Sequence, residues 1–391
     1  MAILPKAFVT GAGMTRFGVL EDSITELAVN AATRAVEDSG SIGKDIDYLI
    51  IGSQNPAEFT GIDHLSTLLA DCLGIVPAAA TRVETGPSSG ASAFEEAFAL
   101  VKAGLADLVL VIGVEKMSKV NRSIASRILA KMMSYENETR YGATPAALAA
   151  MMARRYMHDY GVTREQLSLV PAKAHRNGHK NHLAHFQKEI TVQEVTHSRK
   201  VADPLTLFDC CPTSDGAAAA VVVSEEKARE LRLLKSAAEV IGVGHATDYL
   251  AVQHRQSLTS MSATIEAAAR AYDMAKIEPH DVDVCEVHDA FSVFELINME
   301  DLGLANRGAA IHMVADGTTE VDGSLPVNPT GGLKARGHPT GATGLAQIRD
   351  AFNQLMMKAP EQLQTGSPEV ALCHNIGGFG NNIVVTILER R

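Results

Sequence analysis

The second half of this sequence repeats the first, and the repeat restricts the possible folds more than any other feature. Three segments of the first half recur later in the same order: residues 7–13 at 238–244, 29–35 at 265–271, and 86–92 at 337–343. Each copy runs from a strand-like segment with glycines, through an Ala-rich helical stretch, to a Gly-x-x-x-Gly-Ala-Ser/Thr turn. This order predicts two copies of one supersecondary unit, related by duplication.

Short Val- and Ile-rich runs alternate with longer Ala-rich stretches, which is typical of an α/β fold with a helix-covered sheet. The segments predicted as strands are 7–11, 48–52, 108–113 and 217–223, and those predicted as helices are 24–36, 93–102, 225–234 and 345–357. A helical, Met- and His-rich insertion separates the two copies. We therefore predict three parts: a first half at 1–116 plus 213–235, an insertion at 117–212, and a second half at 236–391.

Composition excludes several classes of protein. The formal net charge of −11 argues against a nucleic-acid surface, which needs clustered Lys and Arg. No run approaches the roughly 20 apolar residues of a membrane span. The first residues lack a basic segment followed by a long apolar stretch, so we expect a cytoplasmic protein. The five cysteines form neither a CxxC pair nor an evenly spaced framework, which predicts reduced thiols.

One basic segment stands out in this acidic chain. Residues 173–180 contain Lys173, His175, Arg176, His179 and Lys180 and no acidic residue. Such a segment suits a small polyanionic ligand. The alternative is the solvated face of a loop.

The same segment begins a run of histidines at every third or fourth position: His175, His179, His182 and His185. On a helix they would form one stripe resembling a metal site. The Asn177-Gly178 pair and the lack of an apolar face favour a loop instead. We therefore predict no bound metal.

Each half places its glycine turn directly before a long predicted helix. At a helix N-terminus, unpaired N–H groups and the macrodipole lower the pKa of a thiol or hold an anion. Duplication is expected to bring the two turns, at residues 86–92 and 337–343, to one cleft.

Several long motifs resemble the thiolase family, in particular its bacterial, archaeal and sterol-carrier-protein-linked members. The motifs are residues 331–344 (GGLKARGHPTGATG), 287–292 (VHDAFS), 373–378 (CHNIGG), and the junction from 201–205 to 214–218. The resemblance covers essentially the whole chain. It implies the thiolase fold: two duplicated five-stranded α/β halves in five layers, with the insertion as the roof of the active-site cleft.

The resemblance also implies roles for several residues. His338 matches the histidine that activates the nucleophile and helps to hold an oxyanion, and His288 matches a histidine of the oxyanion hole. Asn375 and His374 match the C-terminal glycine-rich loop that supplies a second catalytic group in many relatives. An imidazole suits such work because its ordinary pKa lies near working pH.

Two positions depart from the family pattern. The nucleophilic cysteine of such enzymes is expected at Pro87, which the internal repeat also makes the counterpart of His338. Proline offers neither a nucleophile nor an N–H. At Ala290, sterol-carrier-linked thiolases have a cysteine that acts as acid and base. Cys373 lies two residues before Asn375, on the same face of a regular strand; we expect a buried structural thiol, with an active-site role as the alternative.

Ser88 and Ser89 follow Pro87 and have two interpretations. Either hydroxyl would replace the missing thiol if His338 activated it. Serine is also a preferred N-cap, and proline is common near a helix start, so we expect both to cap the helix beginning near Gly90.

Three functions remain open. The first is a thiolase-like acyltransferase that acts on the α–β carbon bond of an acyl-CoA. The second is a retro-aldolase acting on a β-hydroxyacyl-CoA, which needs no acyl-enzyme. The third is a non-catalytic subunit that binds acyl-CoA or supports an active partner.

The resemblance also implies the ligand and the partners. The coenzyme A thioester enters as a substrate beneath the insertion, near Lys173, Arg176 and Lys180, and no permanently bound cofactor is expected. Relatives form homodimers through an edge strand, here near residues 80–85. Several also need a small zinc-ribbon and OB-fold partner.

Overall fold

The computed structural model describes residues 5–40 and 45–391, so residues 1–4 of the first predicted part lie outside it. Nine strands form one mixed sheet in the order β3-β2-β4-β7-β1-β8-β11-β10-β9. The strands of the first half are β1 (Ala7–Met14), β2 (Tyr48–Gly52), β3 (Ala79–Val83), β4 (Leu108–Glu115) and β7 (Gly216–Ser224). Those of the second half are β8 (Ala238–Thr247), β9 (Val284–Glu286), β10 (Val370–Gly377) and β11 (Asn382–Arg390). Antiparallel pairing of β1 with β8 joins the halves.

The two halves have matching strand orders, which confirms the predicted duplication. From the outer edge inward, β2, β4, β7 and β1 of the first half correspond to β9, β10, β11 and β8 of the second. A shared detail supports the match. The Asp47 carboxylate accepts hydrogen bonds from the backbone at the start of β4, and the Asp283 carboxylate does the same for β10.

The second half differs from the expected five strands. The position that β3 occupies in the first half is filled by a single bridge between Cys285 and Val327. Pro326 lacks an N–H and Asn328 has a positive φ of 54°, so the segment does not continue as a strand. The described second half therefore has four strands and one bridge.

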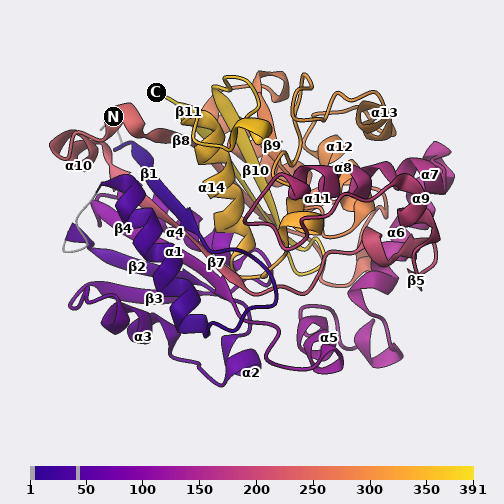
Figure 1. Cartoon of the computed structure of the whole chain (residues 1–391), viewed down its shortest axis with the longest axis horizontal. Helices are drawn as coiled ribbons and strands as arrows, with labels where there is room; N and C mark the ends of the chain where they lie inside the picture. The colour runs from indigo at the N-terminus through magenta and orange to yellow at the C-terminus, as the bar shows by residue number, and fades with distance from the viewer. Residues whose placement is uncertain (1–4, 41–44) are drawn as a thin grey trace.

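Helices and strands alternate in five layers (Figure 1). The middle layer contains the helices α4 (Ser89–Lys102) and α14 (Thr343–Leu355). One outer layer contains α1 (Ile24–Ser39), and the other contains α11 (Ser262–Ala275). Alternate residues along β4 and β7 face opposite sides: Val109 and Ala220 pack against the middle helices, while Leu110 and Val221 pack toward α1. Both faces of the sheet are thus buried, which explains the continuous apolar runs in the sequence.

Glycines in the first strand of each half let the outer helices approach closely. A Cβ on Gly13 of β1 would lie 2.6 Å from the Ala31 carbonyl oxygen of α1. A Cβ on Gly244 of β8 would lie 1.9 Å from the Ala267 carbonyl oxygen of α11. The repeated glycines therefore serve helix packing.

The N-termini of the middle helices touch at the centre of the molecule. A Cβ on Gly90 would lie 2.5 Å from the Gly341 carbonyl oxygen, and one on Gly344 would lie 2.3 Å from the Ala91 nitrogen. The two glycine turns are therefore in direct contact, which confirms that duplication brings them together.

The insertion lies beside the second half and extends toward the first (Figure 1). It contains α5 (Arg122–Ala130), α6 (Pro145–Tyr160), α7 (Arg164–Leu167), α8 (Leu169–His179), α9 (Val192–His197), β5 (Lys200–Ala202) and β6 (Leu205–Thr206). Tyr156 of α6 and residues of α12 (Ser292–Asp301) share one hydrophobic cluster.

The remaining helices outside the insertion are α2 (Pro56–Thr60), α3 (Leu65–Cys72), α10 (Glu225–Glu230) and α13 (Ala310–Ala315). The exact boundaries of the three predicted parts stay a prediction.

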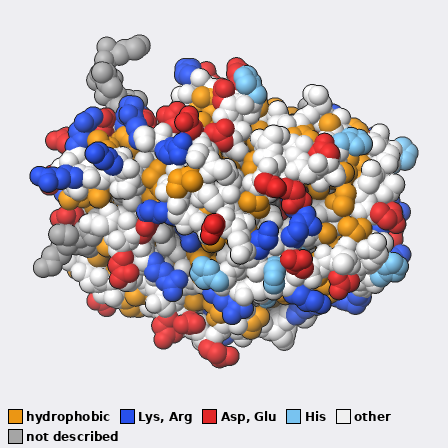
Figure 2. Space-filling view, turned by 45° about the horizontal axis from the view of Figure 1, so that its top comes forward, with side chains coloured by type: hydrophobic (Ala, Val, Ile, Leu, Met, Phe, Trp, Pro, Cys, Tyr) orange, Lys and Arg blue, Asp and Glu red, His pale blue; other side chains and the backbone are white. Residues whose placement is uncertain are grey.

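The surface drawn in Figure 2 carries interspersed acidic and basic side chains. Within the described residues, no helix has the length and apolarity needed to cross a membrane.

The central contact predicts a strong size limit at Gly344. Gly344→Ala would push a methyl group into the α4 backbone, and overpacking of this kind costs about 1–3 kcal/mol or more. We expect a lower free energy of unfolding in urea denaturation. Gly18→Ala is the matched control, because its added Cβ would meet only a Leu20 methyl at 3.6 Å. Equal stability of the two variants would contradict the tight contact.

Candidate active site

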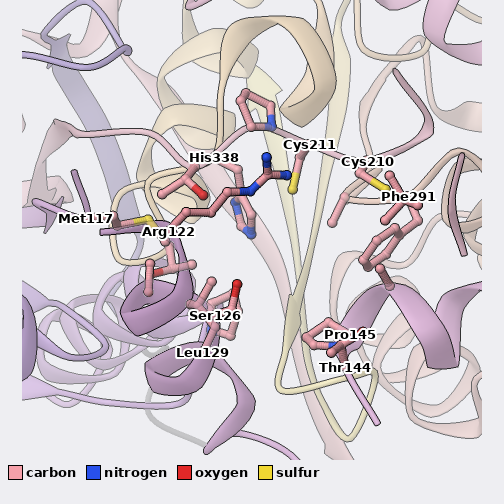
Figure 3. Close-up of a pocket in the computed structure, with 18 of the residues that line it drawn as sticks. Met117, Arg122, Ser126, Leu129, Thr144, Pro145, Cys210, Cys211, Phe291 and His338 are labelled. Carbon is pink, nitrogen blue, oxygen red and sulfur yellow. The ribbon is translucent and has the colours of Figure 1, made fainter. Parts of the chain in front are cut away.

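A cavity of about 860 Å³ opens between the two turns and the insertion. The first half contributes Pro87, and the second half contributes His288, His338 and Gly378. The insertion contributes most of the remaining lining, including residues of α5, the Thr144–Ala146 segment and the pair Cys210 and Cys211 (Figure 3). All three predicted parts therefore meet at one cavity.

Pro87 lies on the turn before α4, and its ring lines the cavity. Gly86 allows this turn to pack on the C-terminal glycine loop, because its Cβ would lie 2.8 Å from the Gly378 nitrogen. Residue 87 and His338 thus line the same cavity from the two duplicated turns. The turn presents no thiol, hydroxyl or N–H at residue 87.

The hydroxyl groups of Ser88 and Ser89 are both used within the turn. Ser88 Oγ is within hydrogen-bond distance of the Thr85 carbonyl oxygen (2.9 Å) and of Asn382 Oδ1 (3.2 Å). Ser89 Oγ donates to the Gly86 carbonyl oxygen at 2.6 Å and accepts from the Thr85 N–H at 3.1 Å. Both residues are fully buried, and the described cavity lining includes neither.

Helix α4 begins at Ser89 with Ser88 as its N-cap residue, so the predicted helix start is confirmed. The predicted capping bond is wrong, because the Ser88 side chain does not bond the first turn. The two hydroxyl groups instead form hydrogen bonds with backbone carbonyl groups of the turn, and that of Ser88 also lies within hydrogen-bond distance of Asn382. Their geometry gives no support to a serine nucleophile.

The hydrogen bonds of His338 leave its Nε2 as an acceptor. Its Nδ1 lies 2.6 Å from Thr343 Oγ1, and that hydroxyl donates its proton to the Pro339 carbonyl oxygen at 2.9 Å. Thr343 therefore accepts from Nδ1–H, which assigns the proton of the neutral ring to Nδ1. The remaining nitrogen, Nε2, carries a lone pair and can accept a hydrogen bond.

The hydrogen bonds of His288 assign the opposite tautomer. The Ile376 N–H donates to Nδ1 at 3.2 Å, and the Asn375 side-chain nitrogen lies 3.3 Å from the same atom. Nδ1 is therefore an acceptor, and the ring proton is on Nε2. The two rings are perpendicular with centroids 5.0 Å apart. The site thus combines one acceptor imidazole with one donor imidazole.

Both rings are held in the neutral form. Burial lowers the pKa of His338 to about 3, and the nearby Arg336 guanidinium adds to this shift. Burial also lowers the pKa of His288 well below its ordinary value, with His338 as the next largest cause. Arg336 itself is fully buried and pairs with Glu286 and Asp350. Neither imidazole therefore carries a charge near neutral pH.

Asn375 and His374 lie behind His288. Asn375 donates to Gln347 Oε1 of α14 at 2.7 Å, which fixes its amide beside the His288 ring. His374 Nδ1 accepts from the His288 backbone N–H at 3.4 Å, and its Nε2 faces Thr264 of α11 at 3.2 Å. The described cavity lining includes neither residue. Both residues contact His288, and a direct action on substrate stays a prediction.

Cys373 is buried among the strands and middle helices and does not line the cavity as described. Burial raises its pKa well above the ordinary value. This environment agrees with the expected structural thiol.

The three predicted coenzyme-binding cations of the basic segment lie outside the described cavity lining. Lys173 is buried, and its Nζ lies 2.7 Å from Glu295 Oε1 of α12. Arg176 pairs with Glu320, and Lys180 lies at the solvent-exposed end of α8. The described cavity lining contains none of these three cations. Lys173 was a wrong prediction because its partner lies 122 positions away in the sequence.

The histidine run was predicted as a loop, but residues Leu169–His179 form helix α8. Gly178 lies in this helix and packs closely against the segment 332–336. A Cβ added at Gly178 would lie 2.6 Å from the Ala335 side chain. His175 lines the cavity, whereas His185 Nδ1 pairs with Ser214 Oγ at 2.9 Å. Among the described residues, no group of three or more side chains could hold a metal ion.

Three cavity residues were missed by sequence reasoning: Arg122, Cys210 and Cys211. The Cys211 N–H donates to the Ala290 carbonyl oxygen at 2.9 Å, which places it beside a predicted site motif. Thr213 also bridges to His338. The junction motif that begins at residue 201 was the sequence signal that could have indicated Cys210 and Cys211 as cavity residues. Burial raises the pKa of Cys211 to about 12, so this thiol stays protonated.

Comparison with known proteins gives matches along nearly the whole chain. The family described as "Thiolase, N-terminal domain" matches residues 7–226, and "Thiolase C-terminal domain-like" matches residues 244–390. The acetyl-CoA acetyltransferase of Methanothermobacter thermautotrophicus is 40% identical over 387 residues, covering 98% of this chain and 99% of that protein. Sterol carrier protein 2 of Bos taurus is 35% identical over 397 residues, covering 98% of this chain and 72% of that protein.

A solved structure described as the Ltp2-ChsH2(DUF35) aldolase is 28% identical, with a TM-score of 0.86 and 99% of each chain covered. The expected family and its α/β fold are therefore confirmed, while the replacement of a family cysteine by Pro87 stays a prediction. The chain belongs to the thiolase family, with acetyl-CoA acetyltransferases and sterol carrier protein 2 among its relatives.

Proposed function

We propose that this chain binds an acyl-CoA thioester and breaks or forms the bond between its α and β carbons by aldol chemistry, without an acyl-enzyme. The observation that carries the proposal is the complementary pair of imidazoles on a cavity whose first turn presents proline. His338 Nε2 is an acceptor and His288 Nε2–H is a donor. These are the two groups that an enolate-forming step requires.

In the cleavage direction the substrate is a β-hydroxyacyl-CoA. His338 Nε2 takes the proton of the β-hydroxyl group as the bond between the α and β carbons breaks. The bonding electrons move to the thioester, whose enolate oxygen accepts the hydrogen bond from His288 Nε2–H. The His338 imidazolium then returns its proton to the α carbon. The products are an aldehyde or ketone and a shortened acyl-CoA, so atoms and charge balance.

The surrounding residues keep each imidazole in its role. Thr343 holds the His338 tautomer, and the Ile376 N–H holds the His288 tautomer. Both partners belong to the duplicated core rather than to the insertion. These hydrogen bonds favour a preorganised site, in which donors and acceptors need no rearrangement during the reaction.

Thiolase-type acyl transfer is the second candidate, because a relative 40% identical is named acetyl-CoA acetyltransferase. That reaction needs a nucleophile to carry the acyl group. Pro87 supplies none, the serine hydroxyls are bonded within the turn, and the Cys211 thiol has a raised pKa. The aldolase neighbour at 28% identity favours the first candidate. A non-catalytic role leaves the paired tautomers without a use.

The thioester is proposed to enter beneath the insertion, as family members use coenzyme A thioesters. The cavity lining is mostly apolar, with Met117, Leu129 and Phe291 on its walls (Figure 3). Such walls suit the pantetheine and acyl chains. We also propose a cytoplasmic location and a small protein partner, the latter because the aldolase neighbour is described together with ChsH2(DUF35).

His338→Gln tests the base. We expect wild-type protein to cleave a β-hydroxyacyl-CoA, and the variant to lose roughly 10²–10⁴-fold in kcat, the usual contribution of a general base. Release of aldehyde and shortened thioester is followed by chromatography. His179→Gln is the matched control, since His179 lies on α8 with a backbone partner, Gln187. Equal activity of wild type and His338→Gln would move the protein into the non-catalytic class.

Pro87→Cys tests whether the rest of a thiolase site is intact. The new thiol would lie at the N-terminus of α4 and on the cavity shared with His338, where a lowered pKa favours the thiolate. We expect thiolysis of acetoacetyl-CoA to be very low in wild type and higher in the variant. Pro145→Cys, at the start of α6 on the same cavity, controls for a thiol in the wrong place. Strong wild-type thiolysis that Ser88→Ala or Ser89→Ala abolishes would instead identify serine as the nucleophile.

A homodimer through β3 is proposed from the edge position of that strand. Ala79, Thr81 and Arg82 are exposed, and β2 is the single neighbour of β3 in the sheet as described. An exposed edge is a ready surface for strand pairing. We expect a sedimentation mass of about twice 41.6 kDa. Thr81→Glu should shift it to the monomer through like-charge repulsion, while Leu105→Glu, at an exposed loop, should not. A wild-type monomer would contradict this assembly.

A further inference from the structure

Arg122 is a cation of the cavity that the proposed reaction does not use. It is the first residue of α5, and its side chain extends across the cavity toward Cys210 and Cys211 (Figure 3). Its charge acts on the Cys210 thiol, where it partly offsets the rise in pKa caused by burial. Across residues 5–40 and 45–391, no hydrogen bond or ion pair is found for its guanidinium.

The surroundings of Arg122 give it no anionic partner. The described cavity lining contains no Asp or Glu, and its walls near α5 are Met117, Ala125 and Leu129. The helix itself adds an unfavourable contribution, because a cation at the first position faces the positive end of the macrodipole. The first turn of α5 also has no acidic residue. Arg122 is solvent-exposed where it lines the cavity, and a guanidinium without a counter-ion there is accessible to an incoming anion.

The chain path links the segment beside Arg122 to the imidazole pair. The segment it approaches, Cys210–Cys211, continues directly to Thr213, which bridges to His338. Cys211 is also bonded to Ala290, two residues after His288. A ligand that reaches Arg122 from the imidazole pair would therefore do so with its acyl portion.

The geometry points to a substrate class: acyl-CoA thioesters whose acyl chain bears a carboxylate, which pairs with the Arg122 guanidinium. This inference rests on the proposed function, since it names the substrate of that same site. The planar guanidinium matches a carboxylate through two parallel hydrogen bonds, whereas an uncharged chain would leave it unpaired. A phosphate of coenzyme A is the other possible source of negative charge.

Binding of two matched thioesters tests the inference. Glutaryl-CoA and valeryl-CoA have acyl chains of equal carbon number and differ by the terminal carboxylate. With the full-length protein in calorimetry, we expect glutaryl-CoA to bind roughly 10-fold more tightly, the scale of a charged hydrogen bond. Arg122→Gln should remove this preference and leave the affinity for valeryl-CoA unchanged. Arg127→Gln, at an arginine that is also exposed on the same helix but is outside the described cavity lining, should preserve the preference.

Each other outcome overturns the inference in a distinguishable way. Equal affinity of wild type for both thioesters removes the carboxylate preference while the proposed function stands. If Arg122→Gln weakens both thioesters and free coenzyme A alike, Arg122 binds a coenzyme phosphate, and comparison with 3′-dephospho-CoA identifies which one. Failure of wild type to bind any of these ligands overturns the proposed function together with the inference. Thermal unfolding of each variant shows whether the fold is retained.

Discussion

The close approach of two helix N-termini is the constraint on which the rest of this molecule depends. Gly90, Gly341 and Gly344 bring α4 and α14 so near that no Cβ fits between their backbones. This contact sits where the two copies of the duplicated unit face each other. It brings Pro87 and His338 to one cavity, and the insertion supplies most of the other residues that line that cavity. The site is therefore a product of the pseudo-symmetry of the fold.

The chemistry of the site follows from the hydrogen-bond partners of its two histidines more than from the residue type itself. Two histidines alone would be ambiguous, since either ring nitrogen can carry the proton. A hydroxyl that already donates elsewhere fixes one tautomer, and a backbone N–H fixes the other. Burial and the nearby Arg336 charge then keep both rings uncharged. Identical side chains thus acquire opposite roles, one as proton acceptor and one as proton donor.

The sequence predicted the features that depend on local pattern or on the repeat. The duplication, the strand and helix types, the meeting of the two turns, and the places of His288 and His338 were all available from it. The predictions that failed concern residues whose contacts lie far away in the sequence. Lys173 looked like a surface cation because Glu295, which neutralises it, lies far along the chain. The helix around Gly178 was missed because its reason is the packing of Ala335 against it. Arg122 carried no signal, since a sequence does not show which of its exposed arginines line a cavity.

The two-sided burial of α4 has a consequence for how this protein is made. Helix α4 is enclosed by strands of the first half and by α14, which begins about 250 positions later at Thr343. While the ribosome is still synthesising the second half, the face of α4 that α14 will cover has no partner and remains apolar. The central layer cannot be completed before α14 has been synthesised, and long-range packing of this kind leaves apolar surface uncovered for longer during synthesis. Helices that pack against sequence neighbours cover their apolar faces earlier in synthesis.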